Sequence, residues 1–264
     1  NFSLRNRNIG KKAIQLENSL RTGIEFNDFS QILSGEITLI NRLTIPWMET
    51  PFSSQFEKKF KNARTIISAD FSYVDRFAFY LLRTFNTFLG YEWKSSPATT
   101  WQYRPLNFEY TRFDPEILFL QSIKDFPLLL YTYNDGLIIG TNLTYIHNFN
   151  SLASKHVNLI RIFGDESGLL VGEVFKNQTA KGKPLANLFR YVKMDIDYRH
   201  IINFQKTSMH FRGFAGYGLA FQTEARQGEV TLPFFKSYSA GGPNSMRGWP
   251  IRQLGIGSNI FFDT

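Results

Sequence analysis

Alternation of apolar and polar residues is the feature that most constrains what this chain can fold into. In residues 13–26 the apolar side chains fall on one face and the polar or charged side chains on the other. The apolar set is Ile14, Leu16, Leu20, Ile24 and Phe26. The polar set is Gln15, Glu17, Ser19, Arg21 and Glu25. A period of two is that of a β-strand, whose successive side chains point to opposite faces. The run is also long enough to cross a membrane as a tilted strand.

Similar patterns along the chain predict an all-β, antiparallel protein. The ten expected strands are residues 2–7, 13–26, 36–45, 64–73, 77–93, 101–112, 137–146, 156–163, 188–201 and 207–221. Residues 114–135 lose the period of two, which predicts a long loop with a helical turn, and residues 47–62 and 164–184 read as loops. Gly213, Gly216 and Gly218 in the last strand predict close packing or bending there.

The composition leaves two classes of β protein open. Aromatic residues make up 16% of the chain, and no run of 18 apolar residues is present to form a transmembrane helix. Such a chain is either a soluble β protein or a membrane β-barrel in which apolar residues alternate with lumen-facing polar ones. The aromatic row of residues 77–93 ends in Tyr91 and Trp93, which favours the interfacial girdle of a barrel over a large aromatic core.

Charge and cysteine content give little evidence for other functions. The net charge is +8, but the only basic cluster is Lys58, Lys59 and Lys61. A solvated loop explains this cluster better than nucleic-acid binding does, so we expect no nucleic-acid partner. The absence of cysteine is compatible with an oxidising compartment such as the periplasm, and equally with many cytosolic proteins.

No constellation of residues predicts catalysis, a metal or a cofactor. The four histidines, which are His147, His156, His200 and His210, share no metal-ligand spacing. Gly255 and Gly257 lack the remaining features of a dinucleotide-binding loop. Ser245 has no nearby histidine or acid in the sequence to activate it. We therefore expect a protein that is not an enzyme and that holds no cofactor or metal.

One segment near the end of the chain has an ordered motif. Its residues are Ser239, Ala240, Gly241, Gly242, Pro243, Asn244, Ser245, Met246, Arg247, Gly248 and Trp249. The glycines and the Pro-Asn pair favour sharp turns, so a single cation, Arg247, is carried on a constrained turn beside an aromatic ring. From the physics of the residues alone, the motif predicts a turn and no more.

The order of residues 235–254 resembles the sixth-loop motif of the BamA/TamA outer-membrane protein assembly family, most closely its Bacteroidetes TamA-like (TamL) barrels. The resemblance implies a sixteen-stranded transmembrane β-barrel into which the loop folds back. It also implies that the functional motif here is Gly241, Gly242, Pro243, Asn244, Ser245, Met246, Arg247, Gly248 and Trp249.

The resemblance further implies a place and partners for the protein. The place is the bacterial outer membrane, where the family helps to assemble, insert or translocate other proteins. The implied partners are client outer-membrane proteins, a TamB-like periplasm-spanning protein or other assembly subunits, lipid and lipopolysaccharide. Relatives pair the loop arginine with acids on strands that would follow Thr264. Among the residues present, Asp195 and Asp197 are the candidate lumen partners of Arg247.

In this interpretation, residues 1–264 form one partial barrel domain of about ten or eleven strands. The first strand, the last strands and the amino-terminal POTRA domains of the family are expected to be absent. Connections 8–12, 148–155 and 203–206 are short, whereas 114–136, 164–187 and 222–258 are long. Short turns on one side and long loops on the other are typical of outer-membrane barrels. Residues 47–62 depart from this rule, because they form a long connection on the short-turn side.

Two alternatives remain open, a passive porin or transporter and a soluble all-β binding protein. Both would share the alternation, but neither explains the motif. If the chain is a membrane barrel, one set of side chains faces lipid and the other faces the lumen. The lipid-facing set is expected to include Leu16, Leu20, Phe79, Phe85, Phe108 and Ile196, and the lumen-facing set Glu17, Arg21, Asp195 and Asp197.

Overall fold

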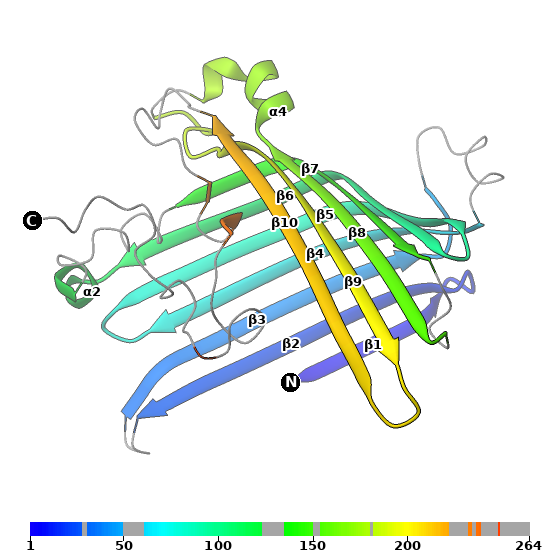
Figure 1. Ribbon diagram of the computed structural model, residues 1–264. Coiled ribbons are helices and arrows are strands. Elements are labelled where there is room, and N and C mark those ends of the chain that lie inside the picture. Colours follow the sequence, from blue (N-terminus) through cyan, green and yellow to red (C-terminus); the bar gives the residue numbers. More distant parts are fainter. Residues whose placement is uncertain are drawn as a thin grey trace, which may run out of the picture.

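The computed structural model describes residues 1–27, 31–49, 61–122, 135–149, 154–179, 182–221, 232–233, 236–238 and 248. These residues form ten antiparallel strands in one sheet, in which spatial order follows chain order (Figure 1). The strands are β1 (Phe2–Ile9), β2 (Ile14–Asn27), β3 (Gln31–Ile45), β4 (Lys61–Arg76), β5 (Tyr80–Ser96), β6 (Thr99–Pro115), β7 (Gly136–Asn148), β8 (His156–Ser167), β9 (Arg190–Asn203) and β10 (Ser208–Phe221). The predicted all-β antiparallel fold is confirmed.

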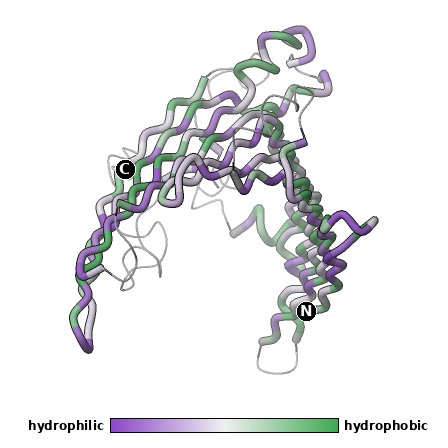
Figure 2. Tube along the Cα trace, turned by 90° about the vertical axis from the view of Figure 1, so that its right-hand side faces the viewer, coloured by the Kyte–Doolittle hydropathy of each residue, from purple (hydrophilic) through white to green (hydrophobic). Residues whose placement is uncertain are grey.

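The sheet is bent but not closed. Figure 2 shows it as an arch with two separate arms. Within the described residues, β1 pairs only with β2 and β10 only with β9, so these strands are the two edges. A continuous, strongly curved meander of this kind has the architecture of an incomplete barrel.

In the part of the chain that the structure describes, short helices accompany the strands. They are α2 (Ile117–Ser122), α4 (Leu169–Val174) and the 3-10 helix η1 (Lys176–Gln178). Helix α2 is the helical turn predicted within residues 114–135. Helix α4 contacts β7, β8 and β9 at one end of the arch (Figure 1). Among the described residues, no helix has the length and hydropathy needed to span a membrane.

The predicted strand 77–93 begins too early. Strand β4 continues to Arg76, and residues 77–79 form a tight turn in which the Phe79 amide donates to the Arg76 carbonyl at 2.8 Å. Ala78 has a positive φ of 65°, a backbone conformation that such a turn requires. Apolar residues continue through the turn, so their pattern could not reveal it. Phe79 therefore lies in a turn and not on a strand face.

The prediction that residues 164–184 form one loop is also wrong in part. Strand β8 continues to Ser167, and α4 and η1 follow it. Asp165 pairs with Lys193 and Ser167 with Tyr191 in the ladder to β9. These polar residues resemble a loop in the sequence because their strand faces a polar surface. Strand β9 begins at Arg190, while Leu188 makes only an isolated bridge with Leu137.

The strand registers separate the side chains into two faces. Paired residues on neighbouring strands lie on the same face, so the registers assign each side chain from β1 to β10 to one of two faces. The set expected to face the lumen lies on one face, called here the polar face. The set expected to face lipid lies on the opposite face, called the apolar face. The polar face carries Glu17, Arg21, Asp195 and Asp197, and the apolar face carries Leu16, Leu20, Phe85, Phe108 and Ile196. This division agrees with the prediction for every residue of the two sets except Phe79, which lies in the turn.

Side chains of the apolar face are exposed in the protein alone. Leu20, Phe85 and Ile196 are 40%, 39% and 38% exposed, and Leu16 and Phe108 are half-buried. Among the described residues, two small clusters of buried apolar side chains are present, and other buried apolar residues lie outside them. One cluster joins Phe113 and Phe119, and the other Ile138, Phe189 and Tyr191. A continuous sheet face of exposed phenylalanine, leucine and isoleucine is unusual for a protein surrounded by water on both sides.

Candidate functional site

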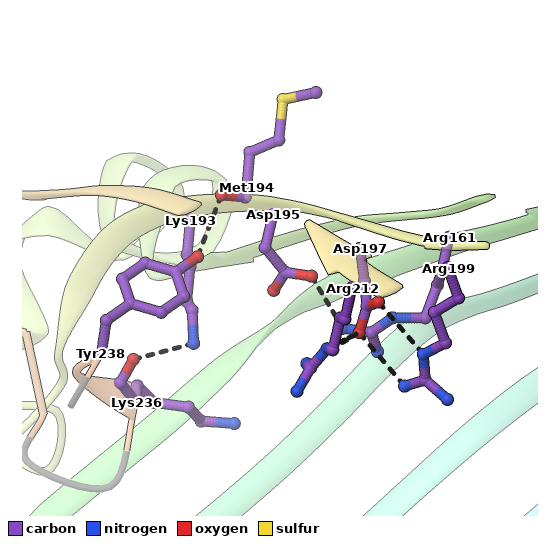
Figure 3. Close-up of polar contacts among 9 residues, drawn as sticks. All are labelled: Arg161, Lys193, Met194, Asp195, Asp197, Arg199, Arg212, Lys236 and Tyr238. Atoms are coloured by element: carbon purple, nitrogen blue, oxygen red, sulfur yellow. Dashed lines mark hydrogen bonds and ion pairs between the residues drawn. The ribbon is translucent and has the colours of Figure 1, made fainter. Parts of the chain in front are cut away.

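Two carboxylates occupy the middle of the polar face on β9. Asp195 accepts a hydrogen bond from Arg161 of β8 at 2.7 Å, and Asp197 accepts from Arg212 of β10 at 2.8 Å and from Arg199 at 3.1 Å. The carboxylate side chains are only 6% and 2% exposed. Figure 3 shows both pointing to the same side of β9, whereas Met194 points to the other.

This cluster places three guanidinium groups around two carboxylates. Charge-assisted hydrogen bonds of this kind are short and strong, and they offset the cost of burying the carboxylates. The sequence predicted that Asp195 and Asp197 share one strand face, but it did not identify their arginine partners. Arg161 and Arg212 come from neighbouring strands, and only the strand register brings them beside β9.

A short segment after β10 lies against the same polar face. The Tyr238 hydroxyl donates to the carbonyl of Met194 at 2.9 Å. The ammonium nitrogen of Lys193 lies 4.2 Å from the centre of the Tyr238 ring, and the ring of Phe214 lies 5.8 Å away, centre to centre. Tyr238 is thereby held between β9 and β10, beside the carboxylate cluster (Figure 3).

Two glycines of β10 make room for this segment. A Cβ atom at Gly216 would lie 2.4 Å from Cζ of Tyr238, and one at Gly218 would lie 2.6 Å from Cδ1 of Leu232. Both distances are far below van der Waals contact, so the segment sits in notches that only glycine leaves open. The predicted close packing is confirmed for these two glycines. Gly213 has no atom of this kind within 4 Å.

Lys236 connects the segment to strands farther along the sheet. Its ammonium nitrogen lies 2.7 Å from Oε1 of Glu109 on β6 and 3.9 Å from Oδ2 of Asp165 on β8. The Lys236 carbonyl accepts a hydrogen bond from Lys193 at 2.8 Å. The Tyr191 hydroxyl donates to Oδ2 of Asp165 at 3.0 Å.

These contacts identify the inside of the arch. Residues 236–238 contact β6, β8, β9 and β10 together. So short a segment reaches strands four places apart only on the concave side of a bent sheet. The polar face is therefore the concave face, and the exposed apolar face is the convex one.

The Tyr238 hydroxyl remains a neutral donor at ordinary pH. Burial against the sheet, and to a smaller extent the negative charge of Asp195, raise the pKa of Tyr238 to about 12. The hydroxyl therefore keeps the proton that it donates to the Met194 carbonyl over the whole physiological range of pH.

Most of the sequence motif lies outside the described residues. This applies to Gly241, Gly242, Pro243, Asn244, Ser245, Met246, Arg247 and Trp249. Gly248 is described and is exposed in a turn. Pairing of Arg247 with Asp195 or Asp197 stays a prediction, and both carboxylates already have arginine partners on the strands. In the described part of the chain, no three His, Cys, Asp or Glu side chains form a group that could hold a metal ion.

Comparison with known proteins bears on the same part of the chain. Residues 171–262 match the family model described as the Omp85 superfamily domain. No curated protein matches the chain. The matched residues include β9, β10, the segment held on the polar face and the motif around Arg247. The match supports, at the level of the superfamily, the resemblance to the BamA/TamA-type family.

Proposed function

We propose that the protein is a non-enzymatic β-barrel of the bacterial outer membrane that assists the assembly, insertion or translocation of other proteins. One observation carries the proposal. Residues 236–238, immediately before the motif, lie on the concave polar face within the region that matches the Omp85 superfamily domain. This is the side to which a loop that folds back into a barrel must turn.

The two faces of the sheet suit this location. In a barrel of this type the convex apolar face contacts lipid and the concave polar face lines a water-filled lumen. The half-exposed arginines around Asp195 and Asp197 then contact water, while the exposed phenylalanines and leucines of the other face are covered by acyl chains. Backbone groups at a free edge in lipid are costly, so in the membrane β1 and β10 each require a further strand partner.

The chemistry of assistance is strand pairing. A barrel whose edge strands pair weakly offers backbone donors and acceptors to an incoming strand, which can join the sheet by β-augmentation. We propose client outer-membrane proteins as the incoming strands. A TamB-like periplasm-spanning protein or other assembly subunits would deliver them, and lipid and lipopolysaccharide would surround the barrel. A TamA-like role within the superfamily is part of this proposal.

The motif provides the test. We expect Arg247→Ala to lower barrel stability or assembly activity more than Arg226→Ala, a similar cation in the same segment but outside the motif. Loss of a charge inside the lumen leaves its partners unpaired and disturbs the loop, whereas loss of a surface charge does not. Lysine at position 247 should restore little, because an ammonium group does not reproduce the planar set of guanidinium donors.

Two measurements are needed on these variants in cells. Heat-modifiability on cold gels reports the folded barrel, and the amount of newly assembled client protein reports activity. Equal behaviour of Arg247→Ala and Arg226→Ala would show that the motif is only a surface turn, and would remove the main support for this function.

A further inference from the structure

The polar face holds the segment before the motif by two different kinds of contact. One is electrostatic, because Lys236 is bound between Glu109 and Asp165. The other is steric, because the Tyr238 ring fills the notch above Gly216. The two contacts involve strands at different places in the sheet, so together they fix both the position and the orientation of the segment.

The Lys236 contact is partly buried and specific. The side chains of Lys236 and Glu109 are each 19% exposed, and that of Asp165 is 3% exposed. Tyr191, which is fully buried, donates to Asp165 and orients this carboxylate. Removing the ammonium group leaves two carboxylates facing one another across a poorly hydrated site, which is unfavourable. The charge of Lys236 therefore matters more than that of an exposed lysine.

The Gly216 contact depends on shape. A methyl group at this position would overlap Cζ and Cε1 of Tyr238, at 2.4 and 2.6 Å. The ring must then shift, which disturbs the hydrogen bond from its hydroxyl to the Met194 carbonyl at 2.9 Å. Gly213 lies on the same strand with open space around it, so the same substitution there tests the backbone effect of replacing glycine.

We propose that Lys236 and Gly216 are positioning residues that clamp the segment before the motif onto the barrel wall independently of Arg247. The inference deepens the proposed function, because the clamp sets where the motif begins its path. In this account Arg247 acts on a loop whose base is already fixed. Substitution of Arg247 alone leaves residues 236–238 in place.

A single cysteine at Ser237 can report the clamp directly. The chain contains no cysteine, and Ser237 lies between the two contacts and is half-buried. The measurement is the rate at which Ser237→Cys reacts with a membrane-impermeant maleimide in the folded, membrane-embedded protein. We expect Lys236→Met to raise this rate roughly tenfold or more, since breaking a partly buried ion pair favours release of the segment.

Matched variants separate the clamp from general damage. Gly216→Ala should raise the labelling rate several-fold, whereas Gly213→Ala and substitution of the exposed Lys183 by methionine should leave it unchanged. Lys236→Arg should keep labelling slow, because it retains the cation. Heat-modifiability of each variant confirms that the barrel is folded. The protein with Ser237→Cys and Arg247→Ala should label as slowly as the protein with Ser237→Cys alone, which is the parent.

The labelling rate does not depend on assembly activity, so it tests the clamp separately from the proposed function. Equal labelling rates for the parent, Lys236→Met and Gly216→Ala would overturn the clamp while leaving the proposed function in place. Slow labelling that rises only in Arg247→Ala would overturn it as well. A rise in Lys236→Met and Gly216→Ala alone, in a protein without assembly activity, would support the clamp and contradict the proposed function.

Discussion

At the scale of the residue, Asp197 shows how the polar face is stabilised. Its carboxylate is 2% exposed and accepts hydrogen bonds from Arg199 on its own strand and from Arg212 on β10. The arginines are about half exposed, at 53% and 47%. Water at the arginine side therefore screens the pair, and its contribution lies below that of a fully buried ion pair.

We predict that Asp197→Asn lowers the free energy of unfolding by about 1.5–3 kcal/mol, which is the range for hydrogen bonds to charged groups. The amide retains the shape of the carboxylate but leaves two guanidinium groups without their counter-ion. Heat-modifiability should show conversion to the unfolded band at a lower temperature. Asp75→Asn on the apolar face of β4 is the control and should change the conversion temperature much less. Equal shifts would mean that the arginines around Asp197 do not stabilise the sheet.

Asp195 and Asp197 also show which features of single residues can be predicted from the sequence. Alternation assigned Asp195 and Asp197 to one face because the period of two is a local property of the chain. It could not identify Arg161 or Arg212 as partners, since a cross-strand neighbour depends on register, and register depends on turns and bulges. The contact of Lys236 with Glu109 is still less accessible to sequence reasoning, because 127 residues separate the two positions.

For the individual strands, alternation predicts that a strand is present but not where it ends. The turn between β4 and β5 carries Phe77 and Phe79, so the apolar pattern passes through it without interruption. At the other extreme, β8 ends in Asp165, Glu166 and Ser167, which resemble a loop although they continue the ladder. Both errors arise because alternation reports what a strand faces, and it does not report where the hydrogen bonds stop.

Strand β5 offers a direct test of what each face contacts. Phe85 lies on the apolar face and its neighbour Thr84 on the polar face. We predict that Phe85→Lys destabilises the folded protein by about 2–4 kcal/mol, the cost of a lysine near the middle of the lipid layer. Thr84→Lys should cost much less because its ammonium group reaches lumen water. Denaturant titration of the protein refolded in lipid vesicles measures both values.

A different result would be as informative. If Phe85→Lys and Thr84→Lys had the same effect, the apolar face of β5 would not lie against acyl chains. In that case the exposed phenylalanines would have to be covered by protein or to tolerate water, and the lipid-facing assignment of the convex surface would be wrong.

For the molecule as a whole, the strands and the two faces could be predicted from alternation, whereas the order of the strands in one curved meander was implied only by the family resemblance. The position of the segment before the motif could not be predicted. Gly216 and Gly218 were the signal in the sequence, because regularly placed glycines in a strand predict close packing. The glycines do not indicate which residues pack against them. The contacts of Tyr238 and Leu232 with β10 identify those residues.

If this barrel assists the assembly of other proteins at the outer membrane, its loss should change the protein content of that membrane. The most direct measurement is the protein composition of the outer membrane, determined by quantitative mass spectrometry after the protein is depleted from its native cells. We predict that a set of other outer-membrane proteins falls and recovers when the protein is restored, but recovers poorly with Arg247→Ala. An unchanged outer-membrane composition, with reduced solute uptake as the only effect, would rule out a role in assembly and favour a passive porin.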